Sequence, residues 1–403
     1  MRICYLCSDL GIPLSGIKGA SAHVRGFVRA VRSLGHDIVV VTSLENQHVG
    51  LDTPVFSIPQ PELFEKFPIE GYPRILRALR HTCNNVMTEK TLLKIINNFQ
   101  PELIYERYSP FAFAGSVVAK KMEIFHTLEV NSLLATEGKL YRKQALQEVS
   151  ELFEQAAFKA TSLIVTVSEN LRELITKTGV LEKRVITVPN GVDESFFIPY
   201  DSSIRERFAD KIVIGFVGSL KPWHGINILV DSFCEIAEHP VYHLLVVGDG
   251  PMRKHFNELE QKFPEQVTYT GGIGHEDIHK YIDAMDICVA PYPKLENFYF
   301  SPLKVYEYMA RGKAVIASDI GQISKLIKHG ETGWLVPAGD TSSLVKAIQA
   351  LSSNQSLREK LGEKASEEVL NNHTWKHRVE YFLNAIKKER PKVKNCSAKE
   401  IMT

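Results

Sequence analysis

Short apolar runs alternate with longer amphipathic segments from one end of the chain to the other. The runs that read as strands occupy residues 2–7, 37–42, 103–105, 125–130, 162–167, 185–188, 211–217, 242–247, 267–269, 287–290 and 314–317. Segments with helical spacing lie between them, among them 21–34, 74–99, 145–159 and 226–237. Because strands that are apolar on both faces occur in parallel sheets covered by helices, the alternation predicts an α/β protein.

The strand–helix pattern restarts after Val192, which predicts two similar domains. The expected segments are an N-terminal Rossmann-like domain (1–192), a polar linker (193–210), a C-terminal Rossmann-like domain (211–372), a helix that returns to the first domain (373–390) and a tail (391–403). We expect the two doubly wound domains to face each other across a central cleft. In this architecture ligands bind at the carboxyl ends of the strands that border the cleft.

Composition narrows the class of protein further. The chain has 403 residues, of which 44% are hydrophobic and 24% charged, as is ordinary for a globular protein. A net charge of +1 supplies no field that would recruit nucleic acid, so we expect no nucleic-acid partner. No apolar run is long enough to span a membrane, and the start of the chain reads as a strand rather than a signal peptide. Six scattered cysteines complete a pattern that predicts a cytoplasmic protein with reduced thiols.

Glycines cluster between the first strand and the first helix. Gly16 and Gly19 allow backbone conformations closed to other residues, and the helix start that follows favours an anion. The dinucleotide fingerprint Gly-x-Gly-x-x-Gly is absent, so the segment is either an anion-binding loop or an ordinary connection. His23, in the first turn of the helix, would contact a phosphate or an acceptor, or would be a satisfied structural histidine.

Two glycine turns follow strands of the second domain. The segment that begins at Gly218 contains Lys221 and His224, which would place positive charge against a diphosphate leaving group. The alternative for Lys221 is a solvated loop lysine. Gly248 begins a Gly-Asp-Gly-Pro turn, which either lines the same site or only starts a helix.

The densest group of candidate residues lies at 298–312, after the strand at 287–290. Ser301 as a helix cap, with Pro302 in the first turn, would expose free N–H groups toward the cleft. Glu307 stands on the same helix in otherwise apolar surroundings and therefore needs a partner. That partner is either the hydroxyl pair of a sugar or, three residues earlier, Lys304.

Three absent motifs exclude other chemistries. Without Asp-x-Asp, a diphosphate bridged by a metal is unsupported. Without Gly-x-x-x-x-Gly-Lys-Ser/Thr the chain is no P-loop nucleotidase, and without Gly-x-Ser-x-Gly it has no nucleophile elbow. We therefore expect no metal site.

Taken together, these segments resemble the retaining GT-B glycosyltransferases of family four, the glycosyl transferases group 1. The resemblance covers nearly the whole chain, and the shared order of several motifs carries it. The motifs are VPNGVD at 188–193, FVG at 216–218, VGDGP at 247–251, YTG at 269–271, APY at 290–292, SPLKVYEYMARG at 301–312 and GETGWLV at 330–336.

The resemblance implies a hexosyltransferase-type enzyme that moves a sugar from a nucleotide-diphosphate donor to an acceptor hydroxyl, with retention, without a metal and without any further cofactor. The C-terminal domain would hold the donor, and the N-terminal domain the acceptor. The implied donor-binding residues are Gly16, Gly19, Gly218, Ser219, Gly248, Gly272, Ile273, Phe300, Ser301, Pro302, Leu303, Lys304 and Glu307. The implied acceptor-binding residues are His23, Glu129 and Asn131, and the acceptor is a saccharide, a lipid-linked molecule or a small molecule.

Four positions depart from the family pattern: Ser219 replaces Arg, His224 replaces Lys, Tyr299 replaces Glu and Asn131 replaces His. The implied catalytic set is Lys221, His224, Glu307 and Asn131. Lys221 is preferred as the counter-charge of the leaving diphosphate, because its charge does not depend on pH near 7. A front-face route, in which the leaving phosphate helps deprotonate the acceptor, suits a site without an obvious carboxylate nucleophile.

The departures keep two other functions open. One is a nucleotide-sugar-binding paralogue with impaired catalysis. The other is a nucleotide-sugar epimerase, which shares the two-domain architecture and needs no acceptor.

Basic residues recur within 72–99 at helical spacing, namely Arg74, Arg77, Arg80 and His81. They would form a face for anionic lipid or an acidic acceptor, which would place the N-terminal domain peripherally on the inner face of a membrane. The alternative, which we favour, is a solvated helix face above a core stripe of Ile75, Leu76, Leu79 and Val86.

Overall fold

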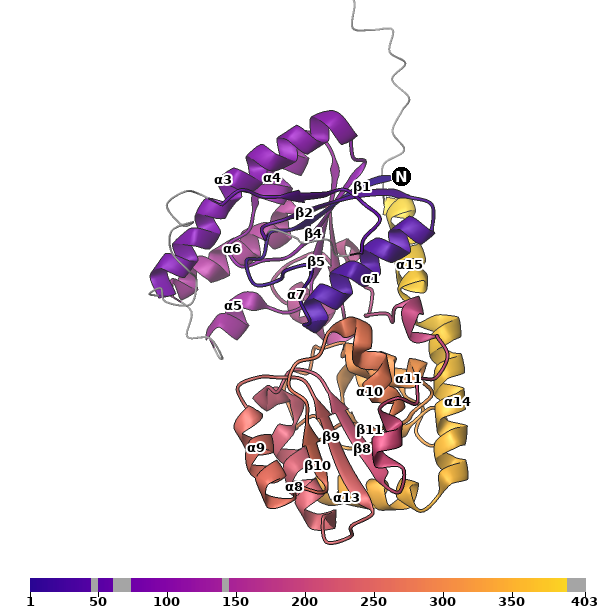
Figure 1. The fold of residues 1–403 in the computed structure, drawn as a ribbon. Helices are drawn as coiled ribbons and strands as arrows, with labels where there is room; N and C mark the ends of the chain where they lie inside the picture. The colour runs from indigo at the N-terminus through magenta and orange to yellow at the C-terminus, as the bar shows by residue number, and fades with distance from the viewer. Residues whose placement is uncertain (45–49, 61–73, 140–144, 390–403) are drawn as a thin grey trace, which may run out of the picture.

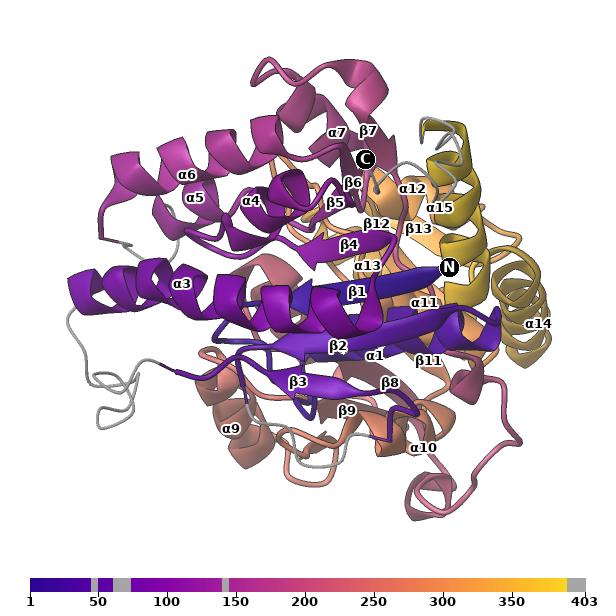
Figure 2. The same cartoon turned by 90° about the horizontal axis from the view of Figure 1, so that it is seen from above.

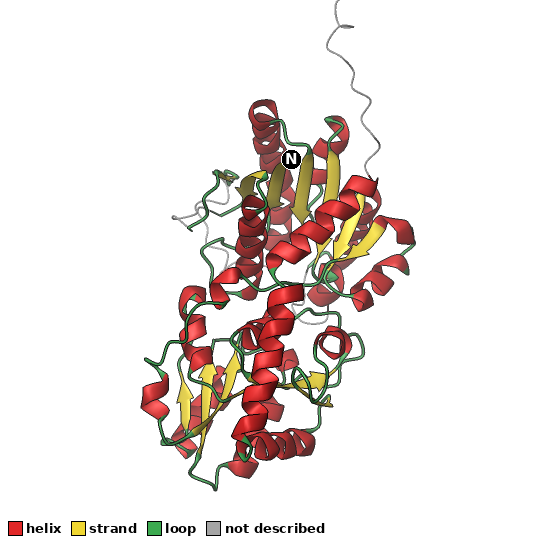
Figure 3. Cartoon of the chain, turned by 90° about the vertical axis from the view of Figure 1, so that its right-hand side faces the viewer, coloured by secondary structure: helices red, strands yellow, loops and turns green. Residues whose placement is uncertain are grey.

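A computed structural model describes residues 1–44, 50–60, 74–139 and 145–389, which form two α/β domains (Figure 1). Figure 3 shows the two sheets one above the other, each with helices packed against it. The predicted tail at 391–403 lies outside the described residues.

The N-terminal sheet has seven parallel strands in the order β3-β2-β1-β4-β5-β6-β7. They are β1 (Arg2–Cys7), β2 (Asp37–Thr42), β3 (Val55–Ser57), β4 (Leu103–Arg107), β5 (Phe125–Val130), β6 (Leu163–Thr166) and β7 (Val185–Thr187). The helices of this domain are α1 (Gly19–Ser33), α3 (Arg74–Phe99), α4 (Ala114–Lys121), α5 (Leu134–Glu137), α6 (Gln147–Ala160) and α7 (Glu169–Thr176).

The C-terminal sheet has six parallel strands in the order β10-β9-β8-β11-β12-β13. They are β8 (Ile212–Val217), β9 (Tyr242–Val247), β10 (Val267–Tyr269), β11 (Ile287–Ala290), β12 (Ala314–Asp319) and β13 (Trp334–Pro337). Its helices are α8 (Ile226–Ile236), α9 (Arg253–Lys262), α10 (Ile278–Asp283), α11 (Leu303–Ala310), α12 (Gly321–Leu326), α13 (Thr341–Ser352) and α14 (Gln355–Asn372). The last helix, α15 (Trp375–Glu389), packs against α1 of the first domain (Figures 1 and 2).

Both sheets repeat one strand order, which confirms the predicted pair of Rossmann-like domains. In each sheet the order reverses beside the first strand, between β1 and β4 and between β8 and β11, where this architecture binds ligands. The strands predicted from apolar runs are all present, and two short edge strands, β3 and β13, were missed. Both are short and only partly buried, although Trp334–Val336 of β13 is itself an apolar run.

The N-terminal core contains the two neighbouring cysteines of β1. Cys4 and Cys7 are buried free thiols, and burial raises the pKa of each to about 12. They are core residues, as the strand pattern of the sequence indicated.

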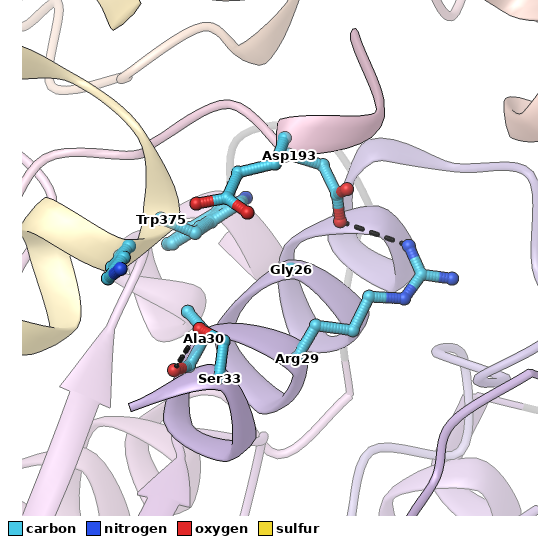
Figure 4. Close-up of a pocket in the computed structure, with 8 residues that line it drawn as sticks. Gly26, Arg29, Ala30, Ser33, Asp193 and Trp375 are labelled. Atoms are coloured by element: carbon cyan, nitrogen blue, oxygen red, sulfur yellow. Dashed lines mark hydrogen bonds and ion pairs between the residues drawn. The ribbon is translucent and has the colours of Figure 1, made fainter. Parts of the chain in front are cut away.

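The two connections between the domains run side by side. Val192 and Thr374 form a parallel bridge, in which Val192 accepts a hydrogen bond from the Trp375 N–H at 3.0 Å. The Trp375 indole lies directly on Gly26 of α1, where a Cβ atom would come within 2.1 Å of Nε1. A cavity of about 130 Å³ lies beside this junction, and the ion pair of Arg29 with Asp193, at 3.0 Å, borders it. Figure 4 shows the residues that line this cavity.

Candidate functional site

The glycine loop of the first domain lies against the second domain. Arg25 of α1 holds the loop by donating a hydrogen bond to the carbonyl oxygen of Gly16 at 2.9 Å. A Cβ atom on Gly19 would lie 3.3 Å from Leu303, and one on Gly272 would lie 2.8 Å from Ile17. The structure therefore brings the predicted glycine loop to the start of α11 and to the loop that contains Gly272.

Lys304 is the buried cation of the C-terminal site. Only 7% of the residue is exposed, and its ammonium group has no hydrogen-bond partner among the described residues. The ammonium lies 3.7 Å from the ring centroid of Phe216, and a Cβ atom on Gly218 would come within 2.9 Å of Nζ. Burial, partly offset by the charge of Glu307, lowers the pKa of Lys304 to about 7.

The position directly after β8, Gly218, requires glycine both because Lys304 lies against it and because of its backbone conformation. Gly218 has a φ of +135°, a conformation that side chains with a Cβ rarely adopt. The nearby Gly248 has a φ of +136°, and its Cβ would collide with the carbonyl oxygen of Gly218 at 2.0 Å. The two turns predicted from sequence thus pack on each other, with Lys304 beside them.

His224 lies in the same group but carries no charge. Its Nδ1 atom donates to the carbonyl oxygen of Ser219 at 2.6 Å, and burial together with the charge of Lys304 lowers its pKa to about 3. A neutral imidazole is a poor counter-charge for a diphosphate. Lys221 lies 5.8 Å from the ring centroid of Trp223. It is half-buried, whereas Lys304 is buried, so Lys304 is the more deeply buried lysine of this group.

Glu307 does not pair with Lys304, the alternative weighed from sequence. Its Oε1 atom accepts a hydrogen bond from Nε2 of His275 at 2.8 Å. His275 begins a short turn three residues after Gly272, so the predicted ribose and base residues do meet at one place. Ile273, which follows Gly272, packs partly buried against the core of this domain.

Residues 299–301 belong to the segment before α11 that is predicted to bind the donor, called the donor loop below. They connect this loop to the first domain. The Tyr299 ring packs into an apolar cluster of the N-terminal domain, with Phe300 beside it. Tyr299 donates its hydroxyl hydrogen to Glu137 at 2.8 Å, and its carbonyl oxygen accepts from Ser168 at 2.7 Å. Ser301 does not cap α11, as the sequence suggested; Pro302 takes the N-cap position, and Ser301 Oγ accepts instead from the N–H of Asn190.

The three residues predicted to bind the acceptor form one cluster. Glu129 is 1% exposed, and its Oε1 atom lies 2.9 Å from Nε2 of His23 and 2.6 Å from the guanidinium of Arg107, while Asn131 donates its amide hydrogen to the same atom. Burial opposes the charged carboxylate, but His23 and Arg107 outweigh it and lower the pKa of Glu129 to about 2. The cluster lies at the carboxyl ends of β4 and β5.

Two of the four basic residues expected on one face of α3, Arg74 and Arg77, are exposed, and the other two are not. Arg80 is buried and donates to Gln60 at 3.1 Å, and His81 is half-buried near the ring of Phe111. The expected core stripe is also wrong, because its apolar residues are exposed: Ile75, Leu76, Leu79 and Val86. Polar residues face inward in this half of α3, since the walls they contact are loop carbonyls and amides rather than apolar side chains.

Sequence reasoning missed three functional neighbours: His275, Arg107 and Asn190. Each follows a strand or lies at its end, as the other site residues do. Arg107 was available as a charged residue at the end of an apolar strand, and Asn190 stood within the VPNGVD motif. His275 had no comparable signal, because its pairing with Glu307 depends on how two separate loops fold together.

In the part of the chain that the structure describes, no group of three or more His, Cys, Asp or Glu side chains is placed to hold a metal ion. The independence from metal therefore stays a prediction. The described helices include none that is long and apolar enough to cross a membrane.

Two facing Rossmann-like domains with a site between them are the arrangement of the GT-B fold. The sequence model "Glycosyltransferase Family 4" matches residues 17–196, and "Glycosyl transferases group 1" matches residues 211–354. The chain belongs to this family of glycosyltransferases.

Known proteins resemble the chain over nearly its full length. An uncharacterized glycosyltransferase of Methanocaldococcus jannaschii is 23% identical over 399 residues, which cover 95% of this chain and 98% of that protein. Sucrose-phosphate synthase of Thermosynechococcus elongatus superposes with a TM-score of 0.73 and 21% identity over 96% of this chain and 98% of that one. HepE of Anabaena, solved in complex with UDP, superposes with a TM-score of 0.71 and 17% identity over 96% and 100% of the two chains.

Proposed function

We propose that the protein transfers a sugar from a nucleotide-diphosphate donor to an acceptor hydroxyl, with retention of anomeric configuration and without a metal ion. The observation that carries the proposal is Lys304, a buried ammonium group at the N-terminal end of α11 that has no hydrogen-bond partner among the described residues. A buried charge without a partner is costly, and a diphosphate would supply the missing anion. The structures of HepE with UDP and with UDP-glucose support a donor of this class.

The donor would be held by groups on both sides of the cleft. Glu307, oriented by His275, would take the ribose hydroxyls, and Gly272 with Ile273 would lie beside the base. The backbone amides of residues 300–304 would face the diphosphate, with the turns at Gly218, Ser219 and Gly248 around it. The loop from Gly16 to Gly19 would cover the phosphates.

Lys304 and Lys221 would neutralise the leaving diphosphate, whereas the neutral His224 would contribute a hydrogen bond. The leaving phosphate oxygen would take the proton of the acceptor hydroxyl as the new glycosidic bond forms on the same face. Barrier lowering would come from positioning and from preorganised charge rather than from a covalent intermediate. Glu129 and Asn131 would hold the acceptor. An NMR assignment of the anomeric configuration of the product tests retention.

The acceptor side carries a second, separate proposal of peripheral contact with the inner, cytoplasmic face of a membrane. In the first half of α3 the polar side chains point inward: Asn84 donates to the carbonyl oxygen of Ser8 at 3.2 Å, and Asn85 donates to that of Phe111 at 2.9 Å. The outward face is apolar and is followed by exposed lysines, in the order Leu76, Leu79, Cys83, Val86, Lys90 and Lys94. An apolar face with adjacent basic residues fits an anionic bilayer.

Sedimentation with vesicles that contain anionic phospholipid tests this contact. We expect binding at low salt, and loss of binding when Leu79 and Val86 are both changed to Glu. The same change at Leu370, an exposed leucine of the other domain, is the matched control. Wild-type protein that stays in the supernatant, or that forms dimers through this face, would exclude the membrane contact.

A thermal-shift and calorimetric screen with UDP, ADP and GDP tests the donor proposal. A ligand at a hundredfold excess over its Kd stabilises by about 2.7 kcal/mol, which is readily measured. Glu307→Gln should weaken the tightest of the three by about tenfold, the value of one hydrogen bond to a charged group. Family membership argues against the epimerase, and slow hydrolysis or transfer of the donor sugar would exclude the impaired paralogue.

A further inference from the structure

Asn190 connects the donor loop to the acceptor-side cluster. Its backbone N–H donates to Ser301 Oγ at 3.0 Å, and its side-chain amide donates to the carbonyl oxygen of Ser301 at 2.5 Å. Its Oδ1 atom lies 2.8 Å from Nδ1 of His23, and its carbonyl oxygen accepts from Arg378 of α15 at 3.2 Å. Asn190 is 8% exposed, so one buried residue joins both domains and the returning helix.

These contacts determine how the His23 ring is used. Because the amide hydrogens of Asn190 face a carbonyl oxygen, the Oδ1 atom faces His23 and can only accept. Nδ1 of His23 is therefore the donor in this hydrogen bond. The other ring nitrogen, Nε2, lies 2.9 Å from Glu129, and the ring stands edge-on to Trp375 with 4.6 Å between centroids. Nδ1 is thus committed to Asn190, whereas Nε2 lies at ion-pair distance from Glu129 and forms no hydrogen bond among the described residues, so His23 is placed to orient Glu129.

One carboxylate oxygen of Glu129 accepts no hydrogen bond from the described residues. Its Oε1 atom takes His23, Arg107 and Asn131, whereas Oε2 is buried without a hydrogen-bond partner in the described part of the chain. A buried carboxylate oxygen that lacks a donor is costly, and a hydroxyl group from a bound molecule would satisfy it.

We propose that Asn190 is a positioning residue that couples the two binding sites: through Asn190 and His23, the seated donor loop orients Glu129 so that its free oxygen accepts a hydrogen bond from the acceptor hydroxyl. This inference rests on the proposed glycosyl transfer, and it moves His23 from acceptor binding to positioning. The seating of Ser301 and the orientation of Glu129 become one event, since two hydrogen bonds and one ion-pair contact join them through Asn190 and His23.

NMR of protein labelled in the histidine rings tests the coupling, with His23→Gln identifying the signals of His23. The probe is the tightest binder among UDP, ADP and GDP, and calorimetry establishes saturation. We expect the probe to shift the His23 ring signals in the wild-type protein and to shift them at most a fifth as much in Asn190→Leu. Asn97→Leu, at an exposed position on α3, is the matched control and should respond as the wild type does.

A second measurement needs no ligand. Ser301→Ala changes the C-terminal domain and does not touch His23, yet we expect it to shift the His23 ring signals in the wild-type background and not in the Asn190→Leu background. If Asn190→Leu does not fold, Asn190→Ser takes its place. Equal shifts with and without Asn190 would overturn the coupling, as would wild-type signals that neither ligand nor Ser301→Ala moves. A failure of all three diphosphates to bind would count against the proposed function, whereas the Ser301 measurement would still decide the coupling.

Discussion

The two domains repeat one strand order but differ in whether the buried charge at the edge of each sheet has a partner of opposite charge. At the carboxyl edge of the N-terminal sheet, the carboxylate of Glu129 is held by His23, Arg107 and Asn131. At the matching edge of the C-terminal sheet, the ammonium group of Lys304 has an aromatic ring for a neighbour and no anionic hydrogen-bond partner among the described residues. The first cluster is nearly complete without a ligand, whereas the second, under the proposed function, would be completed by the diphosphate of the donor.

This difference indicates how each site gains from binding. A paired buried charge contributes to the folded state, and it costs several kcal/mol to remove one of its partners. An unpaired buried charge lowers the stability of the free protein, and part of that cost is recovered when a ligand of opposite charge binds. We therefore expect changes at Glu129 to affect folding, and changes at Lys304 to affect ligand affinity.

The largest expected effect follows from Glu129→Gln, which leaves Arg107 and His23 buried without their counter-charge. The free energy of unfolding at pH 7 should fall by about 3–5 kcal/mol, measured by urea denaturation. The contribution should be present above the usual pKa of a glutamate and should disappear as the pH falls toward 2, because the folded-state pKa of Glu129 is lowered. Glu173→Gln, at an exposed position, is the control and should change stability by less than about 0.5 kcal/mol.

Lys304→Met should lower ligand affinity rather than stability, the opposite of Glu129→Gln. A methionine of similar length removes an unpaired buried charge, so stability should stay constant or rise, while diphosphate affinity should fall about a hundredfold through loss of a charged hydrogen bond. Urea denaturation and calorimetry measure the two quantities on the same samples. Lys325→Met, on an exposed face of α12, should change neither. Loss of stability without loss of affinity would mean that Lys304 is a structural residue.

The lowered pKa of Lys304 predicts how affinity depends on pH. The pKa of Lys304 in the unliganded protein is about 7, so the ammonium group loses its charge above that pH. Affinity for the diphosphate should therefore fall by up to about tenfold for each pH unit above 7. The unliganded protein should change in the other direction: the folded-state pKa lies below the unfolded one, so this group makes the fold more stable as the pH rises from about 7 to about 10.5. Calorimetry between pH 6 and 9 measures the first effect, and Lys304→Met should abolish it.

The same comparison shows what the sequence could and could not reveal. The alternation of strands and helices was visible because buried parallel strands are apolar throughout, and the candidate site residues were proposed because they follow those strands. The burial of Lys304 could not be predicted, since burial is a tertiary property, and the sequence favoured Lys221 as the cation of the site. The exposed apolar face of α3 was read as core for a similar reason: periodicity identifies a helical stripe, but only packing decides whether it points inward.

Tyr299→Phe has the smallest expected effect, and its comparison with Tyr299→Ala separates two accounts of how the domains are held together. By sequence Tyr299 belongs to the C-terminal domain, but its ring lies in an apolar cluster with Tyr108 and Leu128 of the N-terminal domain. Tyr299→Phe removes the hydrogen bond to Glu137 and keeps the ring, so the free energy of unfolding should fall by about 1 kcal/mol. Tyr299→Ala also removes the ring and should cost about 3–5 kcal/mol, as large aromatic truncations do. If both variants lose the same amount, the hydroxyl rather than the ring joins the domains.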